Sequence, residues 1–286
     1  MNVALIKPQG FCSGVTRAVQ LAKQAKLEHP NKTIYILGML AHNQTLVDDL
    51  SKEGFVTLLG DEEKELSSLK EGDILVFTAH GHSEKLDELA SKKGLITYDA
   101  TCFKVKDNLN KIKREINSNH QVIYIGQKGH KEANAALSVS DKVSLYDTKL
   151  LINYYLITDK SPFVINQTTL NFYELKDYHK DILEHYPEAR IENEICNATR
   201  LRQEAILKIE KDTDLIIIVG HQKSSNSNKL FDIAKSNFSN TQVIMVNNLE
   251  ELKEFDIANK RKAALCSGAS TPQYVVDEIY NYLTSL

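Results

Sequence analysis

Short apolar runs rich in β-branched residues alternate along this chain with longer stretches in which apolar positions recur every three or four residues. The spacing in the longer stretches, for example from Val15 to Ala22 and from Val105 to Ile116, is typical of amphipathic helices. Strands separated by helices indicate βαβ units, so we expect an α/β fold with mostly parallel sheets. The runs predicted as strands are Val3–Ile6, Ile34–Leu37, Ile74–Phe77, Leu95–Tyr98, Val122–Ile125, Phe163–Ile165, Leu215–Val219, Val243–Val246 and Ala263–Leu265.

Three of the four cysteines occupy equivalent places in an internal repeat. Cys12, Cys102 and Cys196 each come just before a predicted helix, and their separations are 102 − 12 = 90 and 196 − 102 = 94 residues. Another 286 − 196 = 90 residues lead to the last residue. Regular spacing of this kind is typical of a repeated structural unit. We therefore predict three α/β lobes related by pseudo-threefold symmetry, which span 14–98, 99–193, and 194–286 together with 1–13.

Polar turns follow nearly the same spacing. In each repeat a glycine ends one predicted strand, and a polar residue follows four positions later. A second strand of each repeat leads into a small polar turn. The third copy of this turn lies several residues later than the spacing of the other two predicts. In open α/β sheets, ligands bind beyond the carboxyl ends of the strands, so we expect the cysteines and these turns to surround one central cavity. The pairs are Gly38 with His42, Gly126 with His130 and Gly220 with Ser224, and the turns are FTAHG at 77–81, INQTT at 165–169 and CSGAST at 266–271.

Composition and charge exclude several classes of protein. The 286 residues include 35 basic and 38 acidic side chains, for a formal net charge of −3, and they lack the clustered basic footprint that nucleic-acid binding needs. The longest apolar runs, such as Leu215–Val219, are far shorter than the ~20 residues of a membrane-spanning helix, and no secretory apolar segment opens the chain. We therefore expect a cytoplasmic protein without nucleic-acid or membrane partners. A monomer is the default expectation, because no long exposed apolar helix indicates an obligate interface.

The repeated cysteines suit metal binding. A thiol at a helix amino terminus lies near partial positive charge, which favours the thiolate, and thiolates bind soft metals and iron–sulfur clusters. Three thiolates on a four-iron cluster would leave one iron open to substrate, as in catalytic zinc sites. The spacing alone leaves two alternatives open, a zinc site of three cysteines and a histidine, and three buried packing residues from a gene triplication. Cys266 lies outside the repeat in an apolar AALC run, and we expect it in the core.

The polar turns suit an anion, because N–H groups at a helix start point toward bound phosphate. Each polar residue taken alone also has a structural interpretation as an N-cap or turn residue, and no Walker-type phosphate loop is present. Glu132 stands two residues after His130. Buried in a cavity it would have a raised pKa and could deliver a proton, whereas on a surface it would only be a favourable first-turn acid.

Taken in order, the motifs of this chain resemble those of the 4-hydroxy-3-methylbut-2-enyl diphosphate reductases, the last enzymes of the methylerythritol phosphate route to isoprenoid precursors. The resemblance is collinear over essentially the whole chain. It is carried by GFCSGV at 10–15, AHN at 41–43, TAHG at 78–81, DATC at 99–102, GHKE at 129–132, QTTL at 167–170, ICNATRLRQ at 195–203, SSNSN at 224–228 and SGAST at 267–271.

The resemblance implies a fold of three lobes around a central iron–sulfur cluster, and a reductive dehydroxylation. The allylic hydroxyl of the substrate would leave as water, with electrons from reduced ferredoxin or flavodoxin, to give isopentenyl and dimethylallyl diphosphates. Thr168 and Glu132 would lie near the hydroxyl, with Glu132 central to proton delivery, and Thr199 would support the same site. A 4Fe–4S cluster would be held by Cys12, Cys102 and Cys196, and the diphosphate by His42, His80, His130, Ser224, Ser225, Asn226 and Ser270.

Three positions depart from the family pattern. Phe103 and Lys131 stand where the family commonly has proline, and Asn197 stands where an aromatic residue is usual. None of these changes removes an implied ligand, proton donor or phosphate contact. The loss of proline at 103 and 131 is expected to affect loop rigidity, and hence rate, rather than the type of reaction. Two other classes of function compete with the reductase. One is a non-catalytic sensor of iron–sulfur status or of a phosphorylated metabolite, and the other is a zinc-stabilised phosphate-ester hydrolase.

Overall fold

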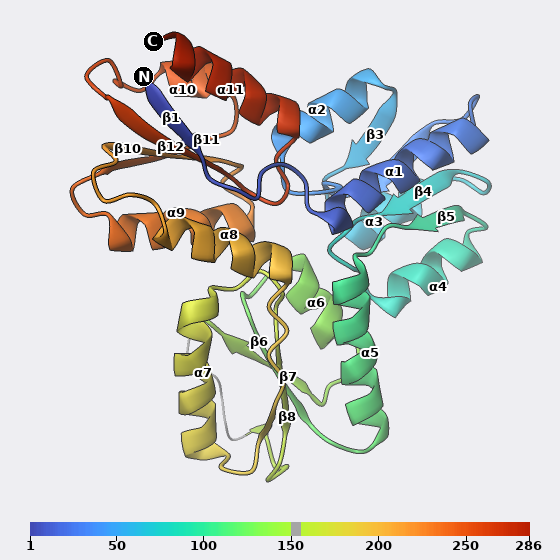
Figure 1. Ribbon diagram of the computed structural model, residues 1–286. Helices are drawn as coiled ribbons and strands as arrows, with labels where there is room; N and C mark the ends of the chain where they lie inside the picture. Colours follow the sequence, from blue (N-terminus) through green and yellow to red (C-terminus); the bar gives the residue numbers. More distant parts are fainter. Residues whose placement is uncertain (150–155) are drawn as a thin grey trace. The chain divides into compact units, whose positions relative to one another are not determined.

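The computed structural model describes residues 1–149 and 156–286, which form three parallel sheets of four strands each flanked by helices (Figure 1). The strands are β1 (Asn2–Leu5), β2 (Ile34–Leu37), β3 (Phe55–Leu58), β4 (Ile74–Phe77), β5 (Ile96–Asp99), β6 (Val122–Gly126), β7 (Val143–Asp147), β8 (Phe163–Asn166), β9 (Arg190–Ile191), β10 (Leu215–Val219), β11 (Gln242–Val246) and β12 (Lys262–Ser267). The helices are α1 (Ser13–Glu28), α2 (Gln44–Lys52), α3 (Glu62–Ser68), α4 (Glu84–Lys92), α5 (Phe103–Asn117), α6 (Lys131–Leu137), α7 (Phe172–His185), α8 (Asn197–Leu207), α9 (Ser225–Asn237), α10 (Leu249–Lys253) and α11 (Gln273–Ser285).

The three sheets share one strand order, which confirms the predicted α/β fold with parallel sheets. The first sheet has the order β3-β2-β4-β5, the second β7-β6-β8-β9, and the third β11-β10-β12-β1. In each sheet the last strand named leads directly to a repeated cysteine. The third sheet takes that strand from the amino terminus, with Asn2 opposite Lys262 and Leu5 opposite Leu265. The repeat in the sequence therefore corresponds to a repeat in topology.

Three edge strands were not predicted from the sequence. β3 has an exposed Val56, β7 alternates apolar with polar residues, and β9 is only two residues long. Edge strands bury less of their surface than central ones, so their apolar signal is weak. The central strands, by contrast, read as continuous apolar runs because helices cover both of their faces.

The second sheet shows how the helices cover the strands. On one face, α5 and α6 pack Ile112 and Ala136 against β6 and β8, and on the other face α7 packs Leu175 and Ile182. Figure 1 shows α7 on one side of this sheet and α5 with α6 on the other. The side chains in these two layers are almost fully buried, so the sheet is a rigid support for the turns at its carboxyl edge.

Two compact units divide the chain. The first consists of Met1–Thr16, Ala41–Gly54 and Asn197–Leu286 and holds the third sheet, and the second consists of Arg17–Leu40 and Phe55–Cys196 and holds the first and second sheets. The predicted boundaries of three lobes, and a central cavity between them, stay predictions. Among the described residues no helix has the length and apolar character to cross a membrane.

Cys266 lies on β12 opposite Ile218 of β10, with 3 % of its surface exposed. This agrees with the expectation of a core residue, and burial raises the pKa of its thiol to about 12. We predict that iodoacetamide labels Cys266 only after unfolding, because a buried thiol that stays protonated is a poor nucleophile. Cys266→Ala should lower the free energy of unfolding by about 1 kcal/mol. Mass spectrometry of the labelled protein and urea unfolding measure the two effects, and rapid labelling of the folded chain would contradict the prediction.

Candidate functional site

The same backbone hydrogen bond fixes each repeated cysteine at the carboxyl edge of a sheet. The N–H groups of Cys12, Cys102 and Cys196 donate to carbonyls at 2.9, 3.0 and 3.0 Å, respectively. The accepting residues are Ala269, Ala79 and Thr168, each two positions after the end of a strand. All three cysteines are partly exposed and precede α1, α5 and α8. The turn that comes late in the third repeat is therefore structurally equivalent to the other two.

In the first unit, the turn at Ala269 and Ser270 connects several predicted site residues. The Ala269 carbonyl accepts from Cys12, while the Ala269 N–H donates to Asn226 Oδ1 at 3.0 Å. Asn226 Nδ2 donates to Thr199 Oγ1 at 3.4 Å, and Ser270 Oγ donates to the His42 carbonyl at 3.1 Å. Five of the predicted residues, Cys12, His42, Thr199, Asn226 and Ser270, thus form one connected group.

The amino terminus of α9 supplies the remaining predicted residues of the first unit. Ser224 is the N-cap, and its Oγ accepts from the Ser227 N–H at 3.3 Å. Ser225 and Asn226 open the helix, and all three residues are buried, with 4 to 7 % of their surface exposed. Neutral hydroxyl and amide groups beside the N–H groups of a helix start make this place suitable for an anion.

In the second unit, Glu132 and Thr168 form a buried pair. Thr168 donates twice to the carboxylate, from its N–H to Oε2 at 2.9 Å and from its Oγ1 to Oε1 at 2.8 Å. Only 3 % of Glu132 and 4 % of Thr168 are exposed. The Thr168 carbonyl also accepts from the Cys196 N–H, so the turn connects the carboxyl group with the cysteine.

Burial raises the pKa of the Glu132 carboxyl above its ordinary value, although the two hydrogen bonds from Thr168 pull it in the opposite direction. Burial, together with the nearby Glu132 charge, also raises the pKa of the Tyr124 phenol well above its ordinary value. Tyr124 lies on β6 with 2 % exposed and was not predicted as a site neighbour, because an apolar strand gave no signal for it. The environment of Glu132 favours the protonated carboxyl, which is the form that a proton donor needs.

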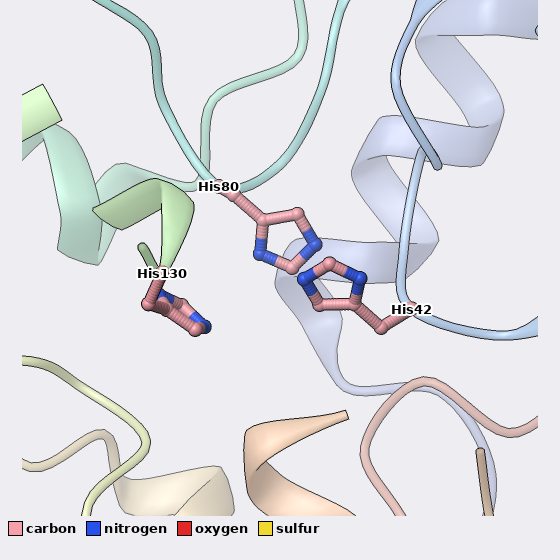
Figure 2. Close-up of side chains that lie close together, drawn as sticks. All are labelled: His42, His80 and His130. Atoms are coloured by element: carbon pink, nitrogen blue, oxygen red, sulfur yellow. The ribbon is translucent and has the colours of Figure 1, made fainter. Parts of the chain in front are cut away.

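His130 is the N-cap of α6, where its Nδ1 accepts from the Glu132 N–H at 3.2 Å. The His130 ring meets the ring of His80 nearly edge to face, with 6.0 Å between the ring centroids (Figure 2). His80 follows Ala79, the residue whose carbonyl accepts from Cys102. The second unit therefore connects Cys102 and His80 on the first sheet with His130 and Glu132 on the second.

An ion pair joins the segments that carry the two cysteines of the second unit. Lys104 Nζ, two residues after Cys102, lies 3.1 Å from Glu194 Oε2, two residues before Cys196. Lys111 contacts the same carboxylate. Burial alone would raise the pKa of Glu194, but the hydrogen bonds from Lys111 and Lys104 outweigh it and lower the pKa. These contacts hold the two cysteine segments beside each other, and they were not predicted from the sequence.

Arg202 is a second positioning residue that sequence reasoning missed. It is 5 % exposed, and its guanidinium donates to the carbonyls of Gly10 at 2.6 Å and Ser267 at 3.2 Å. These contacts fix the segment before Cys12 against the end of β12. Arg202 lies within the matched ICNATRLRQ segment, but one sequence cannot distinguish a buried arginine from an exposed one on a helix.

Comparison with known proteins identifies the family. A family model described as LytB protein matches residues 3–284. This chain belongs to the LytB family. Two relatives, both named 4-hydroxy-3-methylbut-2-enyl diphosphate reductase, come from Bacillus licheniformis and Shouchella clausii. They are 38 % and 36 % identical, and each alignment covers 99 % of this chain and 90 % of the relative. The resemblance inferred from the motifs is confirmed.

Solved structures of LytB-type reductases have the same fold. The structure of the E-1-hydroxy-2-methyl-but-2-enyl-4-diphosphate reductase from Plasmodium falciparum has a TM-score of 0.88 and 30 % identity, covering 99 % of this chain and 88 % of that one. A structure of (E)-4-hydroxy-3-methyl-but-2-enyl diphosphate reductase, described as the terminal enzyme of the non-mevalonate pathway, has a TM-score of 0.70 and 28 % identity, covering 100 % and 99 %.

The raised pKa of Glu132 predicts how the stability of this LytB-family chain depends on pH. The unfolded chain ionises Glu132 near 4.5, whereas the folded chain keeps the proton to higher pH, so the free energy of unfolding falls as pH rises through this interval. Glu132→Gln cannot ionise, and its amide can still accept from the Thr168 N–H and donate to Oγ1. The stability of the wild type relative to this variant should therefore decrease as pH rises above about 4.5 and level off once the folded carboxyl has ionised. Urea unfolding of both proteins at several pH values measures the difference. The prediction would be contradicted if the free energies of unfolding of the two proteins changed with pH in parallel.

Proposed function

We propose that this chain is a 4-hydroxy-3-methylbut-2-enyl diphosphate reductase, an oxidoreductase of isoprenoid biosynthesis. The substrate takes up two electrons and two protons and loses its allylic hydroxyl as water, giving isopentenyl or dimethylallyl diphosphate. Membership of the LytB family over nearly the whole chain supports this reaction. The observation in the structure that carries it is the position of Thr168, which bonds both to the buried carboxyl group of Glu132 and to the cysteine segment at Cys196.

The donor set of the three cysteines fits a 4Fe–4S cluster. Cys12, Cys102 and Cys196 are partly exposed, are not in disulfides, and stand at helix amino termini, where the thiolate is favoured. Their backbone N–H groups bond to the strand-end turns, and these bonds do not involve the sulfur atoms. When bound, such a cluster supplies single electrons and one Lewis-acidic iron without a cysteine ligand. Cys266 is not part of this set, because it is buried in β12.

The diphosphate serves to orient the substrate, and we assign its binding to neutral donors. Product carries the same diphosphate and must leave, which favours histidine, serine and asparagine over a cluster of permanent cations. The buried start of α9 and the contact between the His80 and His130 rings support the assignment. The proposed donors are His42, Ser224, Ser225, Asn226 and Ser270 of the first unit, and His80 and His130 of the second, with Thr199 supporting Asn226.

Glu132 holds the proton that the departing hydroxyl needs. Hydroxide is a poor leaving group, so protonation of the oxygen must accompany C–O cleavage. Burial keeps the carboxyl protonated above its ordinary pKa, and Thr168 fixes the orientation of both of its oxygens. Thr168 also has a hydroxyl that can bond to the substrate oxygen. His130 caps the helix turn on which Glu132 stands, so the diphosphate donor and the proton donor are adjacent in one rigid turn.

We also propose the setting in which the enzyme works. Electrons come from reduced ferredoxin or flavodoxin, since each carries the single electrons that a cluster accepts. We propose a cytoplasmic location, because the reducing cytoplasm keeps cysteines in the thiol form. We propose a monomer, as expected from a sequence without a long apolar helix that would indicate an obligate interface.

The cluster assignment predicts metal content. Protein purified without oxygen should contain about four irons with matching acid-labile sulfide per chain. Each of three single variants, with serine in place of Cys12, Cys102 or Cys196, should lose most of the iron and sulfide. A four-iron cluster held by only two thiolates is labile. Cys266→Ser is the matched control and should retain both. Iron and sulfide assays check the content, and zinc without sulfide in folded wild-type protein would contradict it.

The proton assignment predicts the behaviour of Glu132→Gln. Turnover should fall about 100-fold or more, the range typical for a lost general acid. Iron and sulfide content and substrate binding should be retained, because the amide preserves the shape and both contacts with Thr168. Glu184→Gln, an exposed acid on α7, is the control and should keep full activity. Undiminished turnover in the Glu132 variant would refute the role of this residue.

A further inference from the structure

Lys131 lies between two proposed site residues at the start of α6, His130 and Glu132. It is the first residue of the helix, with the N-cap His130 before it and the buried Glu132 after it. Its own side chain points away from the second sheet and contacts the first. Lys131 Nζ lies 2.5 Å from Glu62 Oε1, and Glu62 is the first residue of α3. About one quarter of the Lys131 side chain and one third of the Glu62 side chain are exposed.

The ammonium group of Lys131 also fits against Gly38, the glycine that follows β2. A Cβ atom at Gly38 would lie 2.3 Å from Lys131 Nζ, so the ammonium occupies space that any other residue would fill. Gly38 has φ of +92°, a conformation that glycine adopts without strain. The ammonium group therefore pairs with a carboxylate at the start of α3 and also lies close to the glycine at the end of β2.

Both contacts lie at the edge of the first sheet that carries His80. β2 and β4 are neighbours, with Leu37 opposite Phe77, so Gly38 and His80 both lie just beyond the ends of adjacent strands. The rings of His80 and His130 meet nearly edge to face, with 6.0 Å between their centroids. A contact between α6 and Gly38 therefore acts directly on the spacing of these two histidines.

We propose that Lys131 is a positioning residue that fixes the distance between His80 and His130 by joining the start of α6 to Glu62 and Gly38. The inference rests on the proposed function, in which both histidines bind the diphosphate. A chelating pair binds best when its spacing is fixed before the ligand arrives, because the ligand then need not order it. The Glu132–Thr168 bonds join α6 to the turn after β8 and do not involve the Lys131 side chain.

The test separates substrate affinity from turnover. Lys131→Met should raise KM and the inhibition constant of inorganic diphosphate about fivefold, which matches the loss of one partly exposed ion pair, while kcat changes by less than about twofold. Glu62→Gln should have the same effect, and the two substitutions together should have no more effect than either one. Exchanging the charges, with Lys131→Glu and Glu62→Lys in one protein, should restore part of the affinity.

Two control variants distinguish positioning from general stabilisation. Lys128→Met removes an exposed charge from the same loop, and Lys113→Met removes another ion pair between the two sheets, the one that joins α5 to Glu84 of α4. Both should leave KM and the diphosphate inhibition constant unchanged. An unchanged KM in Lys131→Met, or an equal rise in Lys113→Met, would overturn the inference. Absence of turnover in wild-type protein with a full cluster would instead overturn the proposed function.

Discussion

One backbone hydrogen bond, made three times, sets the position of the whole candidate site. A parallel strand must be followed by a crossover, and the first N–H groups of the next helix have no partner within that helix. Here the N–H of each repeated cysteine donates to the carbonyl two residues beyond a neighbouring strand. The bond satisfies a backbone donor and fixes the cysteine at the carboxyl edge of the sheet. It uses only backbone atoms, so it does not involve the sulfur.

The accepting residue of this bond is where the repeat stops being symmetric. It is Ala79 in the first sheet and Ala269 in the third, but Thr168 in the second. Of these three residues only the threonine has a hydroxyl, and it donates to the carboxylate of Glu132. The repeated backbone bond thus positions three cysteines in the same way, while the second repeat adds a buried carboxyl group beside its turn. Burial of Glu132 opposes ionisation, and the Thr168 bonds keep its carboxyl oriented.

Local patterns in the sequence predicted the parts that depend on the repeat itself. Buried central strands such as β6 and β10 are continuous apolar runs, and cysteines before helices were recognised by their spacing. Edge strands such as β9 were not predicted, because two residues are too few to show the alternation of apolar and polar positions that identifies a strand. Contacts between distant segments were not predicted either. Glu194 and Lys104 are 90 residues apart, and either one alone has the sequence signature of an exposed charge. Such pairs become visible only when the fold brings them together.

The departure at Lys131 shows that one turn can be fixed in two physically different ways. A proline, which the family resemblance leads one to expect there, fixes φ locally and reduces the freedom of the unfolded chain. A lysine has no such local effect, so the rigidity must come from elsewhere, and here the ammonium reaches Glu62 and Gly38 on the neighbouring sheet. The restraint then holds the turn relative to another sheet rather than within its own helix. Proline would restrict the shape of the turn, whereas the ion pair restricts where the turn lies with respect to His80.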